Sequence, residues 1–79
     1  MTLQDKFDAA MAKSREATLS EQQKADFYSL MKQSTVGDAF GERPNDEDEG
    51  FRYDAWKNLA GTSKEEAMQK FVDLANTLP

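Results

Sequence analysis

The stretch from Ser63 to Leu78, SKEEAMQKFVDLANTL, carries the strongest structural pattern in the chain. Its apolar residues recur three and four positions apart, which places them on one face of a helix. They are Met68, Phe71, Val72, Ala75 and Leu78. Thr62-x-x-Glu65 and Ser63-x-x-Glu66 both fit the capping box that starts many helices. We therefore expect an amphipathic helix from this point to the end of the chain.

A helix is also expected from Glu49 to Ala60, just upstream. Gly61 follows it as the type of residue that most often accepts the left-handed conformation after a helix. The inward candidates of this helix are Phe51, Ala55, Trp56 and Leu59.

The first half of the chain predicts two more helices, at Leu3–Arg15 and Glu21–Gln33. Thr2 can cap the first, and Ser20-x-x-Gln23 is a capping box for the second. The inward residues of the first are Leu3, Phe7, Ala10, Met11 and Ser14, and those of the second are Ala25, Phe27, Leu30 and Met31. No segment needs to be a strand, so we predict a small all-α bundle in one domain, residues 1–79.

Residues 34–46, STVGDAFGERPND, have no period and contain two glycines and a proline, which indicates a loop. A loop of this length in so small a domain is often functional. Residues 46–49 after it are all acidic. They have two readings: a metal site, whose ligand spacing is not that of an EF-hand, or the acidic first turn of a helix, which the helix dipole favours. The second reading is preferred.

Composition excludes several classes of protein. The 79 residues include no cysteine and no histidine, so no disulfide, thiolate zinc site or Ser-His-Asp triad is possible. The net charge of −5 argues against a nucleic-acid binder. No apolar run is long enough to insert stably into a membrane, and the first residues do not resemble a signal peptide. We expect a cytoplasmic binding module rather than an enzyme.

Two of the ten basic residues have aromatic neighbours. Lys32 follows Tyr28 by one helical turn, and Arg52 lies between Phe51 and Tyr53. Such a pair suits a phosphorylated ligand with a ring, because the cation meets the phosphate while the aromatic packs on the ring. Taken alone the signal is weak, since tyrosine–lysine pairs are common on solvated helix faces.

Several long motifs resemble those of the acyl-CoA-binding protein family. Tyr28-Ser29-x-x-Lys32-Gln33-Ser34-Thr35-Val36-Gly37-Asp38 is similar to the family signature. So are Glu42-Arg43-Pro44, Asp54-Ala55-Trp56 and the run from Leu59 to Met68, in the same order. The resemblance covers nearly the whole chain. It implies an up-down-down-up four-helix bundle with a long connection between the second and third helices, which coincides with the 34–46 loop.

The implied function is to bind and carry long-chain fatty acyl-CoA esters, without catalysis, metal or cofactor. By position, Tyr28 matches a tyrosine that contacts the nucleotide, and Lys32 a lysine that meets the 3′-phosphate. Arg52 stands where the family has a phosphate-binding lysine. The other implied ligand contacts are Phe7 and Met11 for the acyl chain, and Met31, Tyr53 and Phe71 where the family has aromatics. Arg15, or Lys13 beside it, falls near a further family lysine.

Met31 and the acidic residues 46–49 depart from the family pattern, and this leaves an alternative function. The chain is then a helical protein-interaction module that has lost tight acyl-CoA binding. Under the first reading the expected partners are the ester itself and, transiently, enzymes that use acyl-CoA. A monomer is the simplest oligomeric state.

Overall fold

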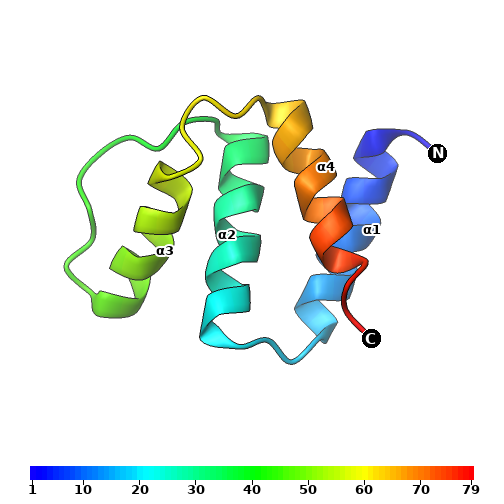
Figure 1. The fold of residues 1–79 in the computed structure, drawn as a ribbon, viewed down its shortest axis with the longest axis horizontal. Helices are drawn as coiled ribbons and strands as arrows, with labels where there is room; N and C mark the ends of the chain where they lie inside the picture. Colours follow the sequence, from blue (N-terminus) through cyan, green and yellow to red (C-terminus); the bar gives the residue numbers. More distant parts are fainter.

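The computed structural model covers residues 1–79 and contains four helices and no strand. They are α1 (Leu3–Glu16), α2 (Glu21–Thr35), α3 (Glu47–Lys57) and α4 (Lys64–Ala75). Figure 1 shows α2 and α3 running in one direction and α1 and α4 in the other, with a long connection between α2 and α3. The predicted all-α, up-down-down-up bundle is therefore confirmed.

Helix α2 lies between its neighbours, since it packs against both α3 and α4, while α1 packs against α4. In Figure 1 both chain ends lie on the side of α1 and α4, away from α3. The Cα atoms span 38 × 27 × 14 Å, so the short dimension is little more than the diameter of one helix, about 10–12 Å. So thin a layer leaves room for hollows on both broad faces.

Phe71 of α4 is the centre of the core. Its ring lies 5.0 Å from that of Phe7 and 5.1 Å from that of Phe27, both edge to face. Such pairs add about 0.5–1.5 kcal/mol each beyond the burial of their area. The other members of the buried cluster are Ala10, Leu30, Val72, Ala75 and Leu78. The stripe predicted along residues 68–78 is thus largely the core, with Met68 half-buried beside it. The helix was expected to continue to the end of the chain, and this is wrong: it ends at Ala75, and Leu78 reaches the core from the turn that follows.

The helix starts follow the capping patterns of the sequence. Thr2 and Ser20 each accept a hydrogen bond from the backbone N–H three residues on, and the reciprocal side-chain bond completes both boxes. Ser63 rather than Thr62 caps α4, and it accepts from the N–H of Glu66 at 3.1 Å. The predicted starts of α1 and α2 are confirmed.

The predicted bounds of the third helix are wrong at both ends. The helix begins at Glu47 because Asp46 is its N-cap and accepts from the N–H of Glu49 at 3.0 Å. It ends at Lys57, after which the backbone tightens to three-residue hydrogen bonds such as Leu59 N–H to Trp56 O. The acidic residues 46–49 therefore form the N-cap and first turn of α3, which is the interpretation that the sequence favours over a metal site.

Phe51 was expected to face inward, and this is wrong: it is 44% exposed, whereas Trp56 on the same helix is buried. Gly61 closes the tightened turn after α3 with φ +89°, a value that glycine adopts without strain.

Hydrogen bonds made by three side chains hold the 36–46 connection against α3. The indole N–H of Trp56 donates to Gly37 O at 2.7 Å, and the Tyr53 hydroxyl donates to Gly41 O at 2.8 Å. Arg43 Nε donates to the Asp54 carboxylate at 3.0 Å, and this bond raises the pKa of the guanidinium. The long loop is therefore part of the packed structure.

Asp38 links this loop to the turn before α4. Its Oδ1 accepts from Gln33 Nε2 at 2.7 Å and from Gly61 N–H at 3.0 Å. Gln33 is fully buried and also donates to Thr62 O at 2.8 Å. The hydrogen bond from Gln33, followed by that from Gly61, lowers the pKa of the Asp38 carboxyl. Because the pKa of this carboxyl is lower in the folded chain than in the unfolded chain, its charge stabilises the fold at every pH above the unfolded-state pKa. That stability is lost as the pH falls through the folded-state pKa.

We expect Asp38→Asn to lower the urea midpoint of the chain at pH 7 and to lose most of that effect in strong acid, well below about pH 4, where the wild-type carboxyl is also protonated. Circular dichroism at both pH values measures the difference. Glu42→Gln is the matched control, because this carboxyl lies exposed in the same loop and has no hydrogen bond. A midpoint loss for Asp38→Asn that is equal at both pH values would contradict the charge-based account.

Candidate ligand cavity

A cavity of about 400 Å³ opens between α1, α2 and α3, with Phe71 of α4 at its base. Six of the nine predicted ligand residues line it: Met11, Arg15, Tyr28, Met31, Arg52 and Phe71. These residues are far apart in sequence and come from four helices. The fold therefore brings most of the predicted site together in one place.

Helix register explains how α2 contributes. Lys24, Tyr28 and Met31 are four and three positions apart, so they share one face of the helix. Met11 and Arg15 have the same spacing on α1. The cavity thus opens between these faces of α1 and α2, and Arg52 of α3 and Phe71 of α4 complete its lining.

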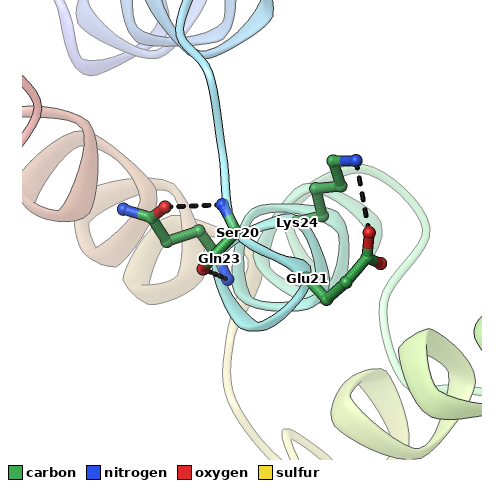
Figure 2. Close-up of polar contacts among 4 residues, drawn as sticks. All are labelled: Ser20, Glu21, Gln23 and Lys24. Atoms are coloured by element: carbon green, nitrogen blue, oxygen red, sulfur yellow. Dashed lines mark hydrogen bonds and ion pairs between the residues drawn. The ribbon is translucent and has the colours of Figure 1, made fainter.

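The charged residues that line the cavity are all basic: Arg15, Lys24 and Arg52. This is notable in a chain of net charge −5, because a local group of cations attracts an anion against the field of the whole molecule. Lys24 Nζ lies 3.4 Å from a Glu21 oxygen. Figure 2 shows this pair on the first turn of α2, beside the Ser20–Gln23 capping box. The pair is largely exposed, so it holds Lys24 only weakly.

Three predicted ligand residues do not line the cavity. Phe7 is 2% exposed and belongs to the core. Tyr53 packs on Trp56 and donates its hydroxyl to the loop. Lys32 lies next to the cavity residue Met31, and its ammonium is placed 5.8 Å from the ring centre of Tyr28 and 5.5 Å from that of Trp56. Lys32 therefore lies beside the cavity, within reach of its rim.

Four cavity residues were not predicted as ligand residues: Ser14, Leu19, Lys24 and Phe27. Lys24 has a signal in the sequence, because it precedes Tyr28 and Lys32 in the same i, i+4, i+8 row. Phe27 is 5% exposed and serves the core and the cavity floor together. A core stripe in the sequence does not show which of its members border a hollow.

Two other surface hollows lack this combination of groups. One of about 600 Å³, between α2, α3 and α4, carries Asp26 and Asp73 with Lys70. The other, of about 340 Å³ on α1 and α4, carries Lys6, Lys13 and Asp73. Neither is lined by an aromatic ring. Volume alone does not choose a ligand site here, but the lining of the first cavity suits an anion with a ring and an apolar chain.

The structure groups no three carboxylates in a way that could hold a metal ion. No helix has the length and apolar content needed to cross a membrane.

Comparison with known proteins places this geometry in context. Residues 4–75 match the family model described as acyl CoA binding protein. The chain is 37% identical to acyl-CoA-binding protein homolog 3 of Caenorhabditis elegans, over 99% of this chain and 74% of that protein. It is 40% identical to acyl-CoA-binding domain-containing protein 2 of Oryza sativa subsp. japonica, over 91% of this chain and 84% of that protein. The crystal structure of Oryza sativa acyl-CoA-binding protein 2 superposes with a TM-score of 0.88 at 34% identity, and covers 98% of this chain and 90% of that one.

Proposed function

The chain belongs to the acyl-CoA-binding protein family, and from this premise we propose that it binds long-chain fatty acyl-CoA esters tightly and carries them. The observation that supports this best is the lining of the cavity between α1, α2 and α3. It combines three cations, no carboxylate and the rings of Phe27, Tyr28 and Phe71. An acyl-CoA needs such a mixture, because it joins phosphates and a purine ring to an apolar chain.

We assign the polar head group to the cationic side of this cavity. Arg15, Arg52 and Lys32 meet phosphates, where a cation forms charge-assisted hydrogen bonds of about 1.5–3 kcal/mol each. Tyr28 and Met31 contact the nucleotide, with Tyr53 supporting this side through Trp56. Lys24, which lines the cavity as well, adds a fourth positive charge if it leaves Glu21.

The acyl chain is assigned to the apolar side of the cavity, along Met11 and Phe71 with Phe7 beneath. A palmitoyl chain has roughly fourteen methylenes, worth about 11 kcal/mol at most if all were buried at about 0.8 kcal/mol each. Association and ordering take several kcal/mol back. Affinity should therefore depend mainly on the chain, and the choice of head group on the phosphate contacts.

The proposal describes a carrier and not an enzyme. The chain has no histidine or cysteine for general-base or nucleophilic catalysis. We propose that residues 1–79 act as one acyl-CoA-binding domain, as a monomer in the cytoplasm, which delivers its ligand through transient contact with acyl-CoA-using enzymes.

Isothermal calorimetry tests this function. We expect one palmitoyl-CoA to bind per chain with a Kd in the nanomolar range, which corresponds to a binding free energy of about −12 kcal/mol. Free coenzyme A and palmitate, titrated separately, should bind far more weakly, because each supplies half of the contacts. Octanoyl-CoA should fall between these and the palmitoyl ester. A folded, helical sample that fails to bind the ester, or that binds palmitate equally well, would overturn the proposal.

A further inference from the structure

The hollow between α2, α3 and α4 lies on the side of α2 opposite the ligand cavity. Asp26, which lines this hollow, is two residues from the cavity residues Lys24 and Tyr28, or about 200° round the helix. We call this hollow the rear groove. It has a volume of about 600 Å³, which exceeds that of the ligand cavity. An occupant of the rear groove would leave the ligand cavity open.

The floor of the rear groove is apolar. Leu30, Leu59 and Leu74 come to it from α2, from the turn after α3 and from α4. Ala55 lies between them, and Phe51, one turn before Ala55 on α3, is 44% exposed. Phe51 and Ala55 are four positions apart within α3, so they share one face of the helix, and Phe51 continues the floor from Ala55 along α3. Phe51 does not belong to the core, and it extends this apolar surface along α3. The surface is therefore long enough to contact more than one side chain of a partner.

Two carboxylates stand along the walls of the rear groove, Asp26 on α2 and Asp73 on α4. Both are held in the same way: the amide of Gln22 donates to Asp26 Oδ1 and that of Gln69 to Asp73 Oδ1, each at 2.9 Å. In neither carboxylate does Oδ2 have a hydrogen-bond or ion-pair partner in the chain. Lys70 also lines the groove, but its ammonium lies 3.7 Å from Glu66.

We propose that the rear groove docks a basic amphipathic helix of a partner protein. The apolar face of that helix, with leucine-like side chains at i, i+3, i+4 and i+7, would lie on the floor, as in other helix-in-groove complexes. Lysines or arginines on both flanks would meet Asp26 and Asp73 on the two walls. The net charge of −5 favours the approach of a basic partner.

This inference does not depend on acyl-CoA binding, because the two surfaces share no lining residue. An anionic ligand is attracted by the cations of the ligand cavity and repelled by the two carboxylates of the rear groove. The two sites can therefore be occupied together, and the failure of one leaves the other untouched.

The test is an NMR titration of the ¹⁵N-labelled chain with a synthetic peptide, at low salt, with and without palmitoyl-CoA. The peptide carries leucines along one helical face, lysines on both flanks and alanine elsewhere. A twin peptide has glutamate in place of each lysine. We expect the lysine peptide to shift the amides of Leu30, Leu59 and Leu74 in both states of the protein, and the glutamate twin to leave them unchanged.

The double variant D26N/D73N should bind the lysine peptide roughly 3- to 30-fold more weakly, as expected for the loss of two exposed charge pairs. D8N is the matched control, because Asp8 on α1 accepts from the amide of Gln4 at 2.9 Å in the same i, i+4 arrangement and lies outside the groove. D8N should bind the peptide as the wild type does.

Any one of the following results would overturn the proposal. The peptide shifts only amides of the ligand cavity, or shifts none. The glutamate twin binds equally well, or D26N/D73N binds the lysine peptide as tightly as D8N does. The rear-groove amides move on simple concentration of the protein, which would assign the groove to a second copy of the chain. They move with phosphatidylcholine vesicles in place of the peptide, which would assign it to a lipid surface.

Discussion

Replacement of Phe71 by alanine should cost about 3–5 kcal/mol of unfolding free energy, the usual loss when a buried phenylalanine is truncated. Phe71 is 2% exposed and makes ring contacts with both Phe7 and Phe27. It thereby ties α4 to α1 and α2. The total free energy of unfolding of a domain of this size is roughly 4–12 kcal/mol, so the alanine variant should be largely unfolded at moderate urea concentrations.

Phe71→Leu gives a measurable version of the same prediction. Leucine keeps most of the apolar volume and loses two edge-to-face pairs, so we expect a loss of about 1–3 kcal/mol. Urea unfolding followed by circular dichroism measures it. Phe51→Leu is the control, because Phe51 is 44% exposed, belongs to no aromatic pair, and should change stability by no more than about 0.5 kcal/mol. Equal losses in the two variants would show that Phe71 is not the centre of the core.

Replacement of Lys32 by alanine should weaken palmitoyl-CoA binding about 10- to 150-fold, the equivalent of one charge-assisted phosphate contact of about 1.5–3 kcal/mol. The Lys32 ammonium is held near the rings of Tyr28 and Trp56, at the side of the cavity. This position suits a head-group contact and is poorly placed for the acyl chain. Binding of palmitate should therefore change little.

Calorimetry with the ester and with palmitate separates the two effects. Lys57→Ala is the matched control, because Lys57 is an exposed cation in the last turn of α3 and lines none of the three hollows. It should leave both affinities close to those of the wild type. Equal losses for ester and palmitate in Lys32→Ala, or an equal loss of ester binding in Lys57→Ala, would contradict a phosphate contact at Lys32.

Local signals in the sequence predict most of the fold. Thr2 and Ser20 start helices because a side-chain oxygen three residues ahead of a free N–H is enough to cap it. The apolar spacing on α4 finds the core because burial of that stripe is the main stabilising term in so small a domain. The resemblance to a family adds the helix directions, which no local pattern contains.

The third helix shows where local signals fail. Its start depends on whether Asp46 is the N-cap or only one more residue of the acidic run, and the sequence is the same in both cases. The structure decides, because the Asp46 side chain accepts a hydrogen bond from the N–H of Glu49. The inward face of the helix was assigned from spacing alone, which fits Phe51 as well as Trp56. Tertiary packing decides: Trp56 is buried and donates to Gly37 O in the long loop, and Phe51 is left exposed on the helix face that it shares with Ala55.

The candidate site was predicted in part for a similar reason. Six predicted residues meet in the cavity. The spacing of Lys24 places it in one row with Tyr28 and Lys32, but it does not show that this row borders a hollow. Phe7, predicted to contact the acyl chain, belongs to the buried core beside Phe71, and its contact with the chain stays a prediction. Which side chains border an opening is a property of the assembled bundle.

The central claim is that an acyl-CoA occupies the cavity between α1, α2 and α3. Its most direct test is an NMR titration of the ¹⁵N-labelled chain with palmitoyl-CoA, read at saturation. We predict that the largest amide shifts fall on residues such as Met11, Arg15, Tyr28, Met31 and Arg52, while those of the rear groove, such as Asp73 and Thr77, stay near their free positions. Shifts centred on the rear groove, or an unchanged spectrum at saturating ester, would contradict the claim.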